Sequence, residues 1–525
     1  MKKLLETVFL LSVFVFLLTS CDTEDSLPPS LTLTSDLVNN AIVDGRSATF
    51  TVTVVSLAET LDIQWVLDGN KVGKTAKITL QIDGEGSHLL VVNVTNMAGT
   101  SSKTINFTAT SKELAIGTIY TSIENNGLLI AGTPLTFTAN IESTTDNTLR
   151  WILNGSEVSK DAKYIFTSED FGEQELILEI TNEDGITCIP FVFRVVGTYG
   201  SGTFVLNEGN MTSENGFVSF IDKQGQITDS VYYKVNSRPL GNTVQNMWVN
   251  DNHIYFISQN GGNMGGDMLV MANSQTLKQE AGYNDALSVL SWPTHVAAVN
   301  PEHVYIRDNK GVYLFNTVSS QLAFIDGTSS AAKNQMVVIN DKIYVMAGSN
   351  VLVLDDNTVE KTIDMGATVS GLIKSYDGNL WVAVKSSPNK VVKVNPTSGE
   401  EMDSKEITIS GVSAGWGATP GIGAYNNVIY FNNAETKVNK LDFITGICTE
   451  VASCKEISDN ANTAYNNISV DPRNGDVYMH TLKGWGMDFL INDLFCWTAT
   501  ANGLELKFDL KDHTHFPTGC YFTKY

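Results

Sequence analysis

The sequence predicts an all-β protein in which two β-sandwich domains precede a seven-bladed β-propeller closed by the C-terminal strand. Three observations support this fold class. Apolar and polar residues alternate in short segments bounded by turn residues, which is typical of strands. One segment occurs twice near the N-terminus, and a shorter unit recurs after Gly200. We expect a signal peptide (1–20), a short acidic tether that begins with Cys21 (21–29), two sandwiches (30–112 and 113–198) and the propeller (200–525).

The N-terminus has the layout of a secretory signal. Lys2 and Lys3 precede an apolar run at 8–18, which is too short for a membrane-spanning helix. The LTSC segment that ends at Cys21 resembles the lipoprotein box of bacteria. This resemblance implies that residues 1–20 are removed and that Cys21 carries a lipid anchor in the membrane. The alternative is an ordinary cleaved signal that leaves Cys21 as a plain thiol.

Acidic residues follow this cysteine at Asp22, Glu24 and Asp25. The patch resembles the surface-export signals of Bacteroidetes lipoproteins, although a solvated acidic linker has the same composition. We therefore expect a lipid-anchored protein of the outer membrane, exposed at the cell surface. No other apolar stretch approaches the ~20 residues of a spanning helix.

The chain is strongly acidic. Its 34 Lys and Arg residues stand against 57 Asp and Glu residues, which gives a formal net charge of -23. A surface of this sign repels phosphate backbones, so no nucleic-acid partner is expected.

Five cysteines remain after Cys21, and an odd number outside the cell leaves at least one free thiol. Cys448 with Cys454, and Cys496 with Cys520, are conceivable disulfide pairs that the sequence does not settle. The spacings do not match a zinc site.

The first repeat is a duplicated sandwich. IQWVLDGNKVGKTAKI, which contains Trp65, aligns without a gap to LRWILNGSEVSKDAKY, which contains Trp151, at an offset of 86 positions (151 minus 65). In each copy we expect the Trp to pack between two sheets. The copies resemble the Ig-like or PKD-like modules of bacterial surface proteins, which implies a role as spacers. A ligand site on a sandwich loop remains an alternative.

The second repeat places a large residue on a strand-like phrase seven times. These residues are Phe204, Tyr255, Tyr305, Tyr344, Trp381, Tyr430 and Tyr478. Their mean spacing is about 46 residues, inside the range for four-stranded propeller blades. The phrase at Phe204 lacks the short apolar strand that precedes the other six, and GCYFTKY at 519–525 is the segment expected to replace it. That pairing hides two sheet edges, because the C-terminus then completes the first blade.

The blades carry a family resemblance. FVLNEGNM followed by NGFVSFID, and then PLGNTVQNMWVNDNHIYFI, resemble the start of the DUF5074, YncE-like propellers of Bacteroidetes surface lipoproteins. This resemblance implies a binding role. Some members of this broad group, the BtuG-like proteins, capture vitamin B12 for an outer-membrane TonB-dependent transporter. No cobalamin-contacting residue can be transferred to this chain.

One face of the propeller is the expected binding site. In the usual blade order, loops between the second and third strands share a face with the loops between blades. Polar candidates on this face are Asn207, Glu208 and Asn210, which either bind ligand or cap the strand end. The other candidates are Trp292, Trp416, Trp485, His513, His515 and Phe516. Flanking glycines allow Trp416 and Trp485 to project outward for ligand stacking, or the loop indoles plug the channel.

Signals for an enzyme are weak. His513 and His515 alternate on a strand-like segment, but no third metal ligand is evident, so we expect no metal site and no cofactor. The sequence has no Gly-rich phosphate loop, nucleophile elbow or His-Glu-x-x-His helix, and we assign no catalytic residue. The favoured function is capture of a small nutrient or glycan for a transporter. The alternatives are a lyase or hydrolase that acts on polysaccharide, and an adhesive scaffold with protein partners only.

Overall fold

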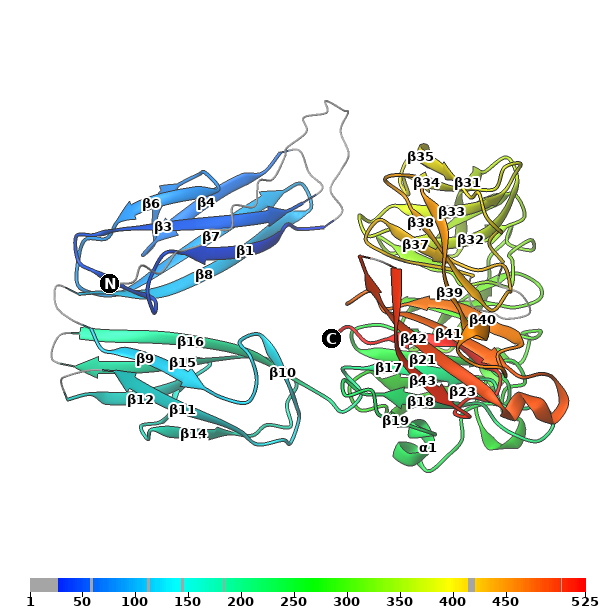
Figure 1. Cartoon of the computed structure of the whole chain (residues 1–525), viewed down its shortest axis with the longest axis horizontal. Helices are drawn as coiled ribbons and strands as arrows, with labels where there is room; N and C mark the ends of the chain where they lie inside the picture. Colours follow the sequence, from blue (N-terminus) through cyan, green and yellow to red (C-terminus); the bar gives the residue numbers. More distant parts are fainter. Residues whose placement is uncertain are drawn as a thin grey trace. The chain divides into compact units, whose positions relative to one another are not determined.

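The computed structural model describes residues 27–525 apart from 57–59, 111–113, 143–145, 183–184, 414–420 and 502. The chain divides into two compact units, an N-terminal and a C-terminal one, and nearly all regular structure in both is β-strand (Figure 1). Within these described ranges, no helix is long and apolar enough to cross a membrane. The predicted signal peptide and Cys21 lie outside the described residues.

The N-terminal part forms two β-sandwiches with equivalent strand orders. In the first, sheet β1-β3-β6 packs on sheet β2-β8-β7-β4-β5, and the second combines β14-β11-β9 with β10-β16-β15-β12-β13. The strands of the first are β1 (Ser30–Ser35), β2 (Ala41–Val43), β3 (Ser47–Val55), β4 (Asp62–Leu67), β5 (Asn70–Gly73), β6 (Lys77–Gln81), β7 (Gly86–Asn96) and β8 (Gly99–Thr110). Those of the second are β9 (Ile116–Tyr120), β10 (Gly127–Ile130), β11 (Leu135–Glu142), β12 (Thr148–Leu153), β13 (Ser156–Ser159), β14 (Lys163–Phe166), β15 (Gly172–Asn182) and β16 (Gly185–Val196).

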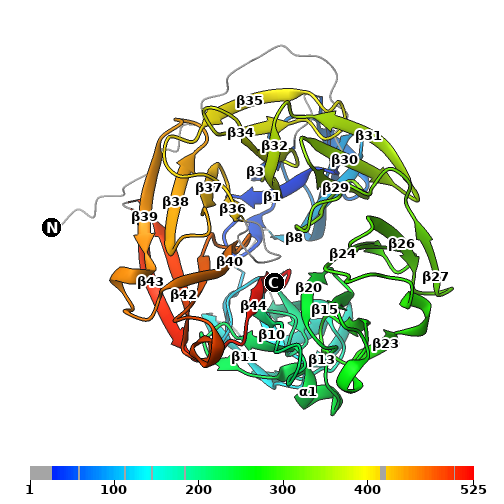
Figure 2. The ribbon, with the colours of Figure 1, turned by 90° about the vertical axis from the view of Figure 1, so that its right-hand side faces the viewer.

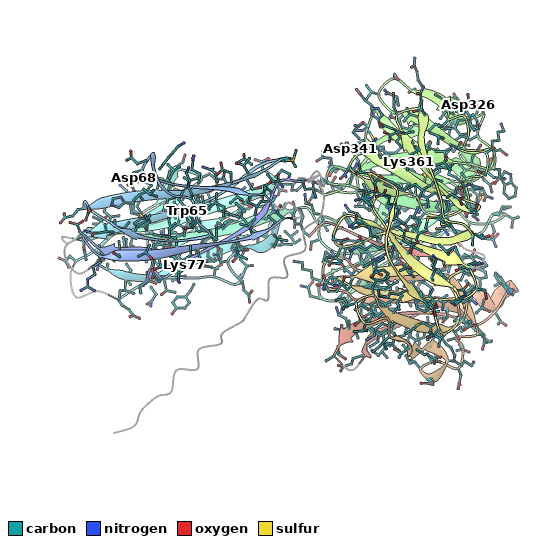
Figure 3. All side chains as sticks on the ribbon, turned by 90° about the horizontal axis from the view of Figure 1, so that it is seen from above. Trp65, Asp68, Lys77, Asp326, Asp341 and Lys361 are labelled. Atoms are coloured by element: carbon teal, nitrogen blue, oxygen red, sulfur yellow. The ribbon has the colours of Figure 1, made fainter. Side chains whose placement is uncertain are left out.

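The duplication extends to individual hydrogen bonds. Trp65 and Trp151 are both fully buried, as the sequence predicts, and Figure 3 shows Trp65 within the first sandwich. Trp65 Nε1 donates to the carbonyl oxygen of Thr75 at 2.8 Å, and Trp151 Nε1 donates to that of Asp161 at 2.9 Å. Both acceptors follow their Trp by the same number of residues. Each indole therefore stabilises the turn that leads to the next strand.

The C-terminal part is a β-propeller-like domain. Its described residues form seven antiparallel four-stranded sheets, ordered β19-β18-β17-β44, β20 to β23, β24 to β27, β28 to β31, β32 to β35, β36 to β39 and β40 to β43. The strands of the first three sheets are β17 (Thr203–Asn207), β18 (Phe217–Ile221), β19 (Ile227–Thr228), β44 (Pro517–Phe522), β20 (Val244–Val249), β21 (His253–Ser258), β22 (Leu269–Asn273), β23 (Gln279–Tyr283), β24 (His295–Asn300), β25 (His303–Arg307), β26 (Val312–Asn316) and β27 (Gln321–Phe324). Those of the next two are β28 (Val337–Ile339), β29 (Lys342–Ala347), β30 (Asn350–Asp355), β31 (Thr358–Asp364), β32 (Thr368–Lys374), β33 (Leu380–Lys385), β34 (Lys390–Val394) and β35 (Glu401–Glu406). Those of the last two are β36 (Ile422–Tyr425), β37 (Val428–Phe431), β38 (Lys437–Asp442), β39 (Cys448–Ser453), β40 (Thr463–Val470), β41 (Val477–Leu482), β42 (Asn492–Thr500) and β43 (Gly503–Lys511).

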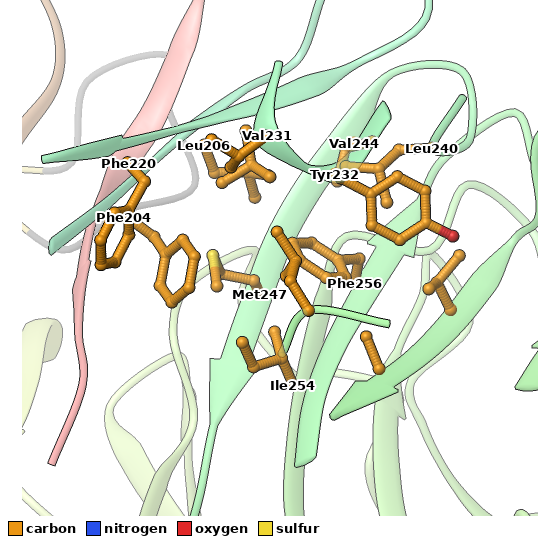
Figure 4. Close-up of a cluster of buried hydrophobic side chains, with 14 residues drawn as sticks. Phe204, Leu206, Phe220, Val231, Tyr232, Leu240, Val244, Met247, Ile254 and Phe256 are labelled. Carbon is orange, nitrogen blue, oxygen red and sulfur yellow. The ribbon is translucent and has the colours of Figure 1, made fainter. Parts of the chain in front are cut away.

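Helical segments are few and short. The described residues include one α-helix, α1 (Val231–Asn236), and four 3-10 helices, η1 (Asn263–Gly265), η2 (Asp285–Leu287), η3 (Cys454–Glu456) and η4 (Gly486–Leu490). Side chains from α1 pack with β17, β18, β20 and β21 in a buried apolar cluster that contains Phe204, Tyr232 and Phe256 (Figure 4). This cluster joins the first two sheets.

Neighbouring sheets meet through their first strands. The strand β20 contacts β44 and β24, and the contacts continue in chain order through β28, β32, β36 and β40, which contacts β44 (Figure 2). The seven large residues that recur in the sequence all lie on second strands and are buried. Three of them reach a hairpin turn of the next sheet. The Tyr305 hydroxyl donates to the Asp356 carbonyl, the Tyr344 hydroxyl donates to that of Pro396, and the Trp381 ring packs on Phe443.

The C-terminal strand pairs antiparallel with β17, the partner that the sequence suggests, with Phe204 opposite Tyr521. Arg473 binds both strands of this pair at one end, where β17 begins and β44 ends. Its guanidinium donates to the carbonyl oxygens of Gly202 and Tyr525 and forms an ion pair with the buried Asp471.

All five described cysteines are free, so neither of the two disulfide pairs considered from the sequence is present among them.

Candidate functional site

The strand order places two sets of loops at one end of the C-terminal sheets, and we call this end the loop face. It contains the loops between second and third strands and the loops that lead into each next sheet. The longest of the first kind follow β17, β21 and β41, at residues 208–216, 259–268 and 483–491. The corresponding loop after β29 has only residues 348 and 349. The loop face is therefore built up on the side of the first, second and seventh sheets.

A polar group, which we call the Glu208 cluster, lies on this face and consists of Glu208, Gln245, Lys333 and Tyr465. The Tyr465 hydroxyl donates to Glu208 Oε1 at 3.1 Å, and the Gln245 side chain also hydrogen-bonds to this carboxylate. Lys333, from the loop before β28, interacts with it electrostatically. Four different regions of the chain thus meet at one carboxylate.

Strand irregularities aim these side chains at one another. The pairing of β20 with β21 shifts between Val244 and Asn246, which makes Gln245 an extra residue. The pairing of β40 with β41 shifts between Ala464 and Ile468, and Tyr465 lies in that interval. Bulges redirect side chains and are frequent near functional sites.

Burial changes the protonation of the cluster. Desolvation raises the pKa of Glu208 to about 7, against the opposing effects of Lys333 and of the hydrogen bonds from Tyr465 and Gln245. The surrounding protein partly desolvates Lys333 and lowers the pKa of its ammonium group, although much of the residue remains exposed. The negative charge of Glu208 raises this pKa and so opposes the shift. At neutral pH the carboxylate is therefore in protonation equilibrium, and when it is ionised its charge balances that of the ammonium.

One atom of the cluster lacks a partner. Gln245 is 2% exposed, and its Oε1 forms no hydrogen bond with any described residue. A buried acceptor without a donor costs roughly 1–3 kcal/mol, so such a group calls for a water molecule or a ligand.

Aromatic rings adjoin the Glu208 cluster and form what we call the platform, made of Tyr465, Trp485, Phe489 and Phe516. The rings of Phe489 and Phe516 stack at 4.4 Å, and those of Phe516 and Trp485 stack at 6.3 Å. Tyr465 meets Trp485 edge-on at 6.0 Å. Trp485 ends the stack and is 55% exposed, which is high for an indole in a packed group.

Backbone hydrogen bonds connect the platform to Glu208. The amide of Glu208 donates to the Phe516 carbonyl at 2.9 Å, and the amide of Gly209 donates to the His515 carbonyl at 3.2 Å. Phe516 adopts φ 54°, a conformation that non-glycine residues rarely take. These bonds hold the strained residue in place, so the platform is preorganised.

Two polar candidates from the sequence support the fold. Asn207 is fully buried, and its Oδ1 accepts a hydrogen bond from the His515 amide at 2.9 Å. Asn210 Oδ1 accepts bonds from the amide and the hydroxyl of Thr212. Both therefore have the strand-end and turn roles that the sequence left open, whereas Glu208 belongs to the site.

The two histidines face different carboxylates. His513 Nδ1 lies 3.0 Å from Asp229 Oδ2, and His515 Nδ1 lies 2.8 Å from Glu214 Oε2. His515 also packs against the ring of Phe489, beneath the platform. In the parts of the chain that the structure describes, no group of three or more His, Cys, Asp or Glu side chains is arranged to hold a metal ion.

Two of the three predicted tryptophans are described, and they make no ring contact with each other. Trp485 and Phe516 come together in the platform. Trp292 lies on the loop before β24, is 53% exposed and forms no ring contact with the described aromatic residues. Trp416 lies outside the described residues.

Sequence reasoning missed three members of the site, namely Gln245, Lys333 and Tyr465. The polar run SDNANTAYNN contains one aromatic residue, Tyr465, and this was the only local signal. Gln245 and Lys333 carry none, because a bulge and a loop contact select them.

A cavity of about 350 Å³ lies along the first strands of the sheets. Its lining includes Asn246, next to Gln245, and Gln335, two residues after Lys333. Trp248 and Tyr521 are also part of the wall. The Glu208 cluster is thus adjacent in sequence to the residues that surround this cavity.

The model of the family described as "Domain of unknown function (DUF5074)" matches residues 201–523, and that of the PKD-like domain matches residues 118–182. No curated protein has a significant match to the sequence. Among solved structures, a quinonprotein alcohol dehydrogenase-like protein from Bacteroides thetaiotaomicron is similar at TM-score 0.50 and 13% identity, over 77% of this chain and 97% of that one. The WD40 β-propeller domain of Doa1 has TM-score 0.38 and 12% identity, over 55% and 88% of the two chains. A protein of unknown function from Bacteroides caccae has TM-score 0.32 and 12% identity, over 62% and 100%. At such identities the first similarity bears on fold alone.

Proposed function

The chain belongs to the family of the domain of unknown function DUF5074, and on this premise we propose that it is a ligand-binding protein of the bacterial cell surface. In this proposal residues 200–525 form a seven-bladed β-propeller that β44 closes, and the loop face captures a small nutrient or a glycan. The sandwiches act as spacers. The contacts between successive first strands, which lead back to β44, support the propeller assignment.

The juxtaposition of Trp485 with the Glu208 cluster is the observation that carries the function. An exposed indole ends a stack of rings, and Tyr465 connects it to the carboxylate of Glu208. The side chain of Gln245 hydrogen-bonds to the same carboxylate, and its amide oxygen has no partner among the described residues. Ligand sites typically combine an apolar surface with a few converging polar groups. Here Gln245 is buried, Glu208 and Tyr465 are half-buried, and the hydrogen bonds to Glu208 orient them before any ligand arrives.

Calorimetric titration of the mature protein with cobalamins, haem and soluble glycans tests this proposal. We expect one class to bind, and Trp485→Ala to weaken that binding at least tenfold while the melting temperature stays within a few degrees of the wild type. Trp292→Ala is the matched control, because it removes a loop indole of nearly equal exposure. Unchanged affinity in Trp485→Ala for the ligand that binds would contradict the site.

The proposed location is the outer surface of the outer membrane, with a lipid on Cys21 and a TonB-dependent transporter as partner. The LTSC segment and the acidic residues after it support this location. Cys21→Ala is expected to abolish incorporation of labelled fatty acid and to release the protein from the membrane fraction. Membrane retention without acylation would exclude the lipid anchor. Co-purification of a transporter after cross-linking in intact cells would test the partner.

Glu208 supports a second candidate function, acid–base catalysis on a polysaccharide. A carboxyl group whose pKa is raised to about 7 is suited to proton transfer near neutral pH. We favour binding, because hydrolysis of glycosides generally uses a pair of carboxyl groups, and only Glu208 is in the cluster as described. Chain cleavage in a glycan panel that disappears in Glu208→Gln would establish the enzyme instead.

A further inference from the structure

We propose that the ligand of the loop face is an uncharged carbohydrate, one sugar ring of which lies on Trp485 with its hydroxyl groups directed toward Gln245 and Lys333. This inference rests on the proposed binding function and names its ligand class. Three properties of the site carry it: its charge balance, its free hydrogen-bonding groups and the exposed indole.

The charges of the Glu208 cluster cancel when the carboxylate is ionised. Glu208 and Lys333 act on each other, and they are its two charged members. The nearby cation Arg307 is 9% exposed, and its guanidinium donates to the Ala331 carbonyl and the Thr294 hydroxyl. At pH 8, where Glu208 is ionised, an anionic ligand therefore meets an ammonium that a carboxylate already balances and a guanidinium whose donors are bonded to the protein. It also approaches a chain of net charge -23.

The free hydrogen-bonding groups require both a donor and an acceptor from the ligand. Gln245 Oε1 is an acceptor without a partner, and Lys333 carries an ammonium with three N–H donors. A hydroxyl group can donate to the first and accept from the second. A carboxylate or a phosphate offers acceptors only and leaves Gln245 unsatisfied.

The exposed indole supplies the third element. Trp485 packs on Phe516 at one end of the ring stack, and more than half of its surface is exposed. The face of an aromatic ring is electron-rich, so it attracts the C–H groups on the flat side of a sugar ring. Tyr465 contacts both Trp485 and Glu208, so one bound sugar can lie on the indole while its hydroxyl groups reach the polar cluster.

A glycan array covering neutral and uronic-acid oligosaccharides, followed by calorimetry, tests the ligand class with the mature full-length protein. We expect binding of a neutral oligosaccharide, loss of at least tenfold in affinity in Trp485→Ala, and little change in Trp292→Ala. Gln245→Leu removes the unpartnered acceptor and is expected to weaken binding about tenfold. A melting curve of each variant shows whether it is folded, and Trp485→Ala decides the result if Gln245→Leu is not.

Charge gives a second and independent test. Glu208→Gln leaves Lys333 unbalanced, so this variant is expected to bind a uronic-acid oligosaccharide several-fold more tightly than the wild type does at pH 8. No increase would contradict the charge-balance argument.

The outcomes distinguish this inference from the proposed function. Binding of cobalamin, haem or a uronic-acid oligosaccharide in preference to every neutral glycan, with loss in Trp485→Ala, would overturn the ligand class and leave the binding site standing. Binding of no compound in either panel, or binding that Trp485→Ala does not alter, would overturn both.

Discussion

Glu208 contributes to the site through both its backbone and its carboxyl group. Its backbone is part of the hydrogen-bonded connection to Phe516, and its carboxyl group accepts bonds from Tyr465 and Gln245 in a poorly hydrated position. The same residue therefore organises the loop and carries a charge that the fold does not favour. Such a cost is common where polar groups are held ready for a ligand.

We expect Glu208→Gln to change how stability depends on pH. The pKa of Glu208 rises from 4.5 to about 7 on folding, so folding is opposed when the carboxyl group ionises. This cost is absent below pH 4.5, grows as the pH rises toward 7 and is complete above it. The variant should therefore be more stable than the wild type at pH 8, by about 3 kcal/mol at most, and should lose this advantage near pH 4.5.

Urea denaturation at pH 4.5, 6 and 8 measures this effect. Glu302→Gln, on an exposed turn, is the matched control and should leave the pH profile unchanged. Parallel profiles for Glu208→Gln and the wild type would show that the carboxyl group is well hydrated in the folded protein.

At the scale of elements, bulges and terminal pairing define the C-terminal domain. The irregular pairing in β20 and β40 turns Gln245 and Tyr465 toward Glu208, while the rest of each strand keeps its ladder. The strand β44 satisfies the edge of β17, and Arg473 binds the backbone of both strands at one end of this pair. An unpaired β17 would expose a sheet edge.

Deletion of residues 519–525 is expected to lower the melting temperature sharply, because it removes most of β44. Arg473→Ala should destabilise the domain less, lowering its free energy of unfolding by about 3 kcal/mol. The substitution leaves Asp471, whose side chain is 1% exposed, buried without its cation. Lys524→Ala is the control. Its ion pair with Asp251 is exposed on both sides and contributes less than about 1 kcal/mol. A deletion variant that melts like the wild type would show that β44 does not stabilise the domain.

At the scale of the whole molecule, the chain consists of two compact units with separate cores. Trp151 lies in the core of the second sandwich, and Trp381 lies between sheets of the C-terminal domain. Both are fully buried. Each unit therefore depends on its own set of apolar contacts.

We expect scanning calorimetry to show separate unfolding transitions for the two units. Trp151→Ala and Trp381→Ala should each destabilise one unit by roughly 3–5 kcal/mol. Each variant should lower the temperature of one heat-absorption peak and leave the other peak near its wild-type temperature. A single peak that both variants shift equally would show that the units unfold as one.

The features that repeat follow from the amino-acid sequence alone. The offset between Trp65 and Trp151 revealed the duplicated sandwich, and the recurring large residues from Phe204 to Tyr478 marked the second strands of the sheets. These signals are readable because burial on a strand imposes the same residue type at the same interval in each copy. The unpaired phrase at Phe204 likewise pointed to the C-terminal segment, since a sheet edge needs a partner.

The composition of the site depends on contacts between distant parts of the fold. Trp485 and Phe516 stood out as loop aromatics, but Gln245 and Lys333 carry no local signal, and Asn207 became a structural residue through its bond to His515. The physical reason is that repeats are set by local burial, whereas the cluster depends on bulges and on loops that break the repeat. The direction in which a bulge turns its side chain depends on contacts with residues far away in the sequence, as between Tyr465 and Glu208.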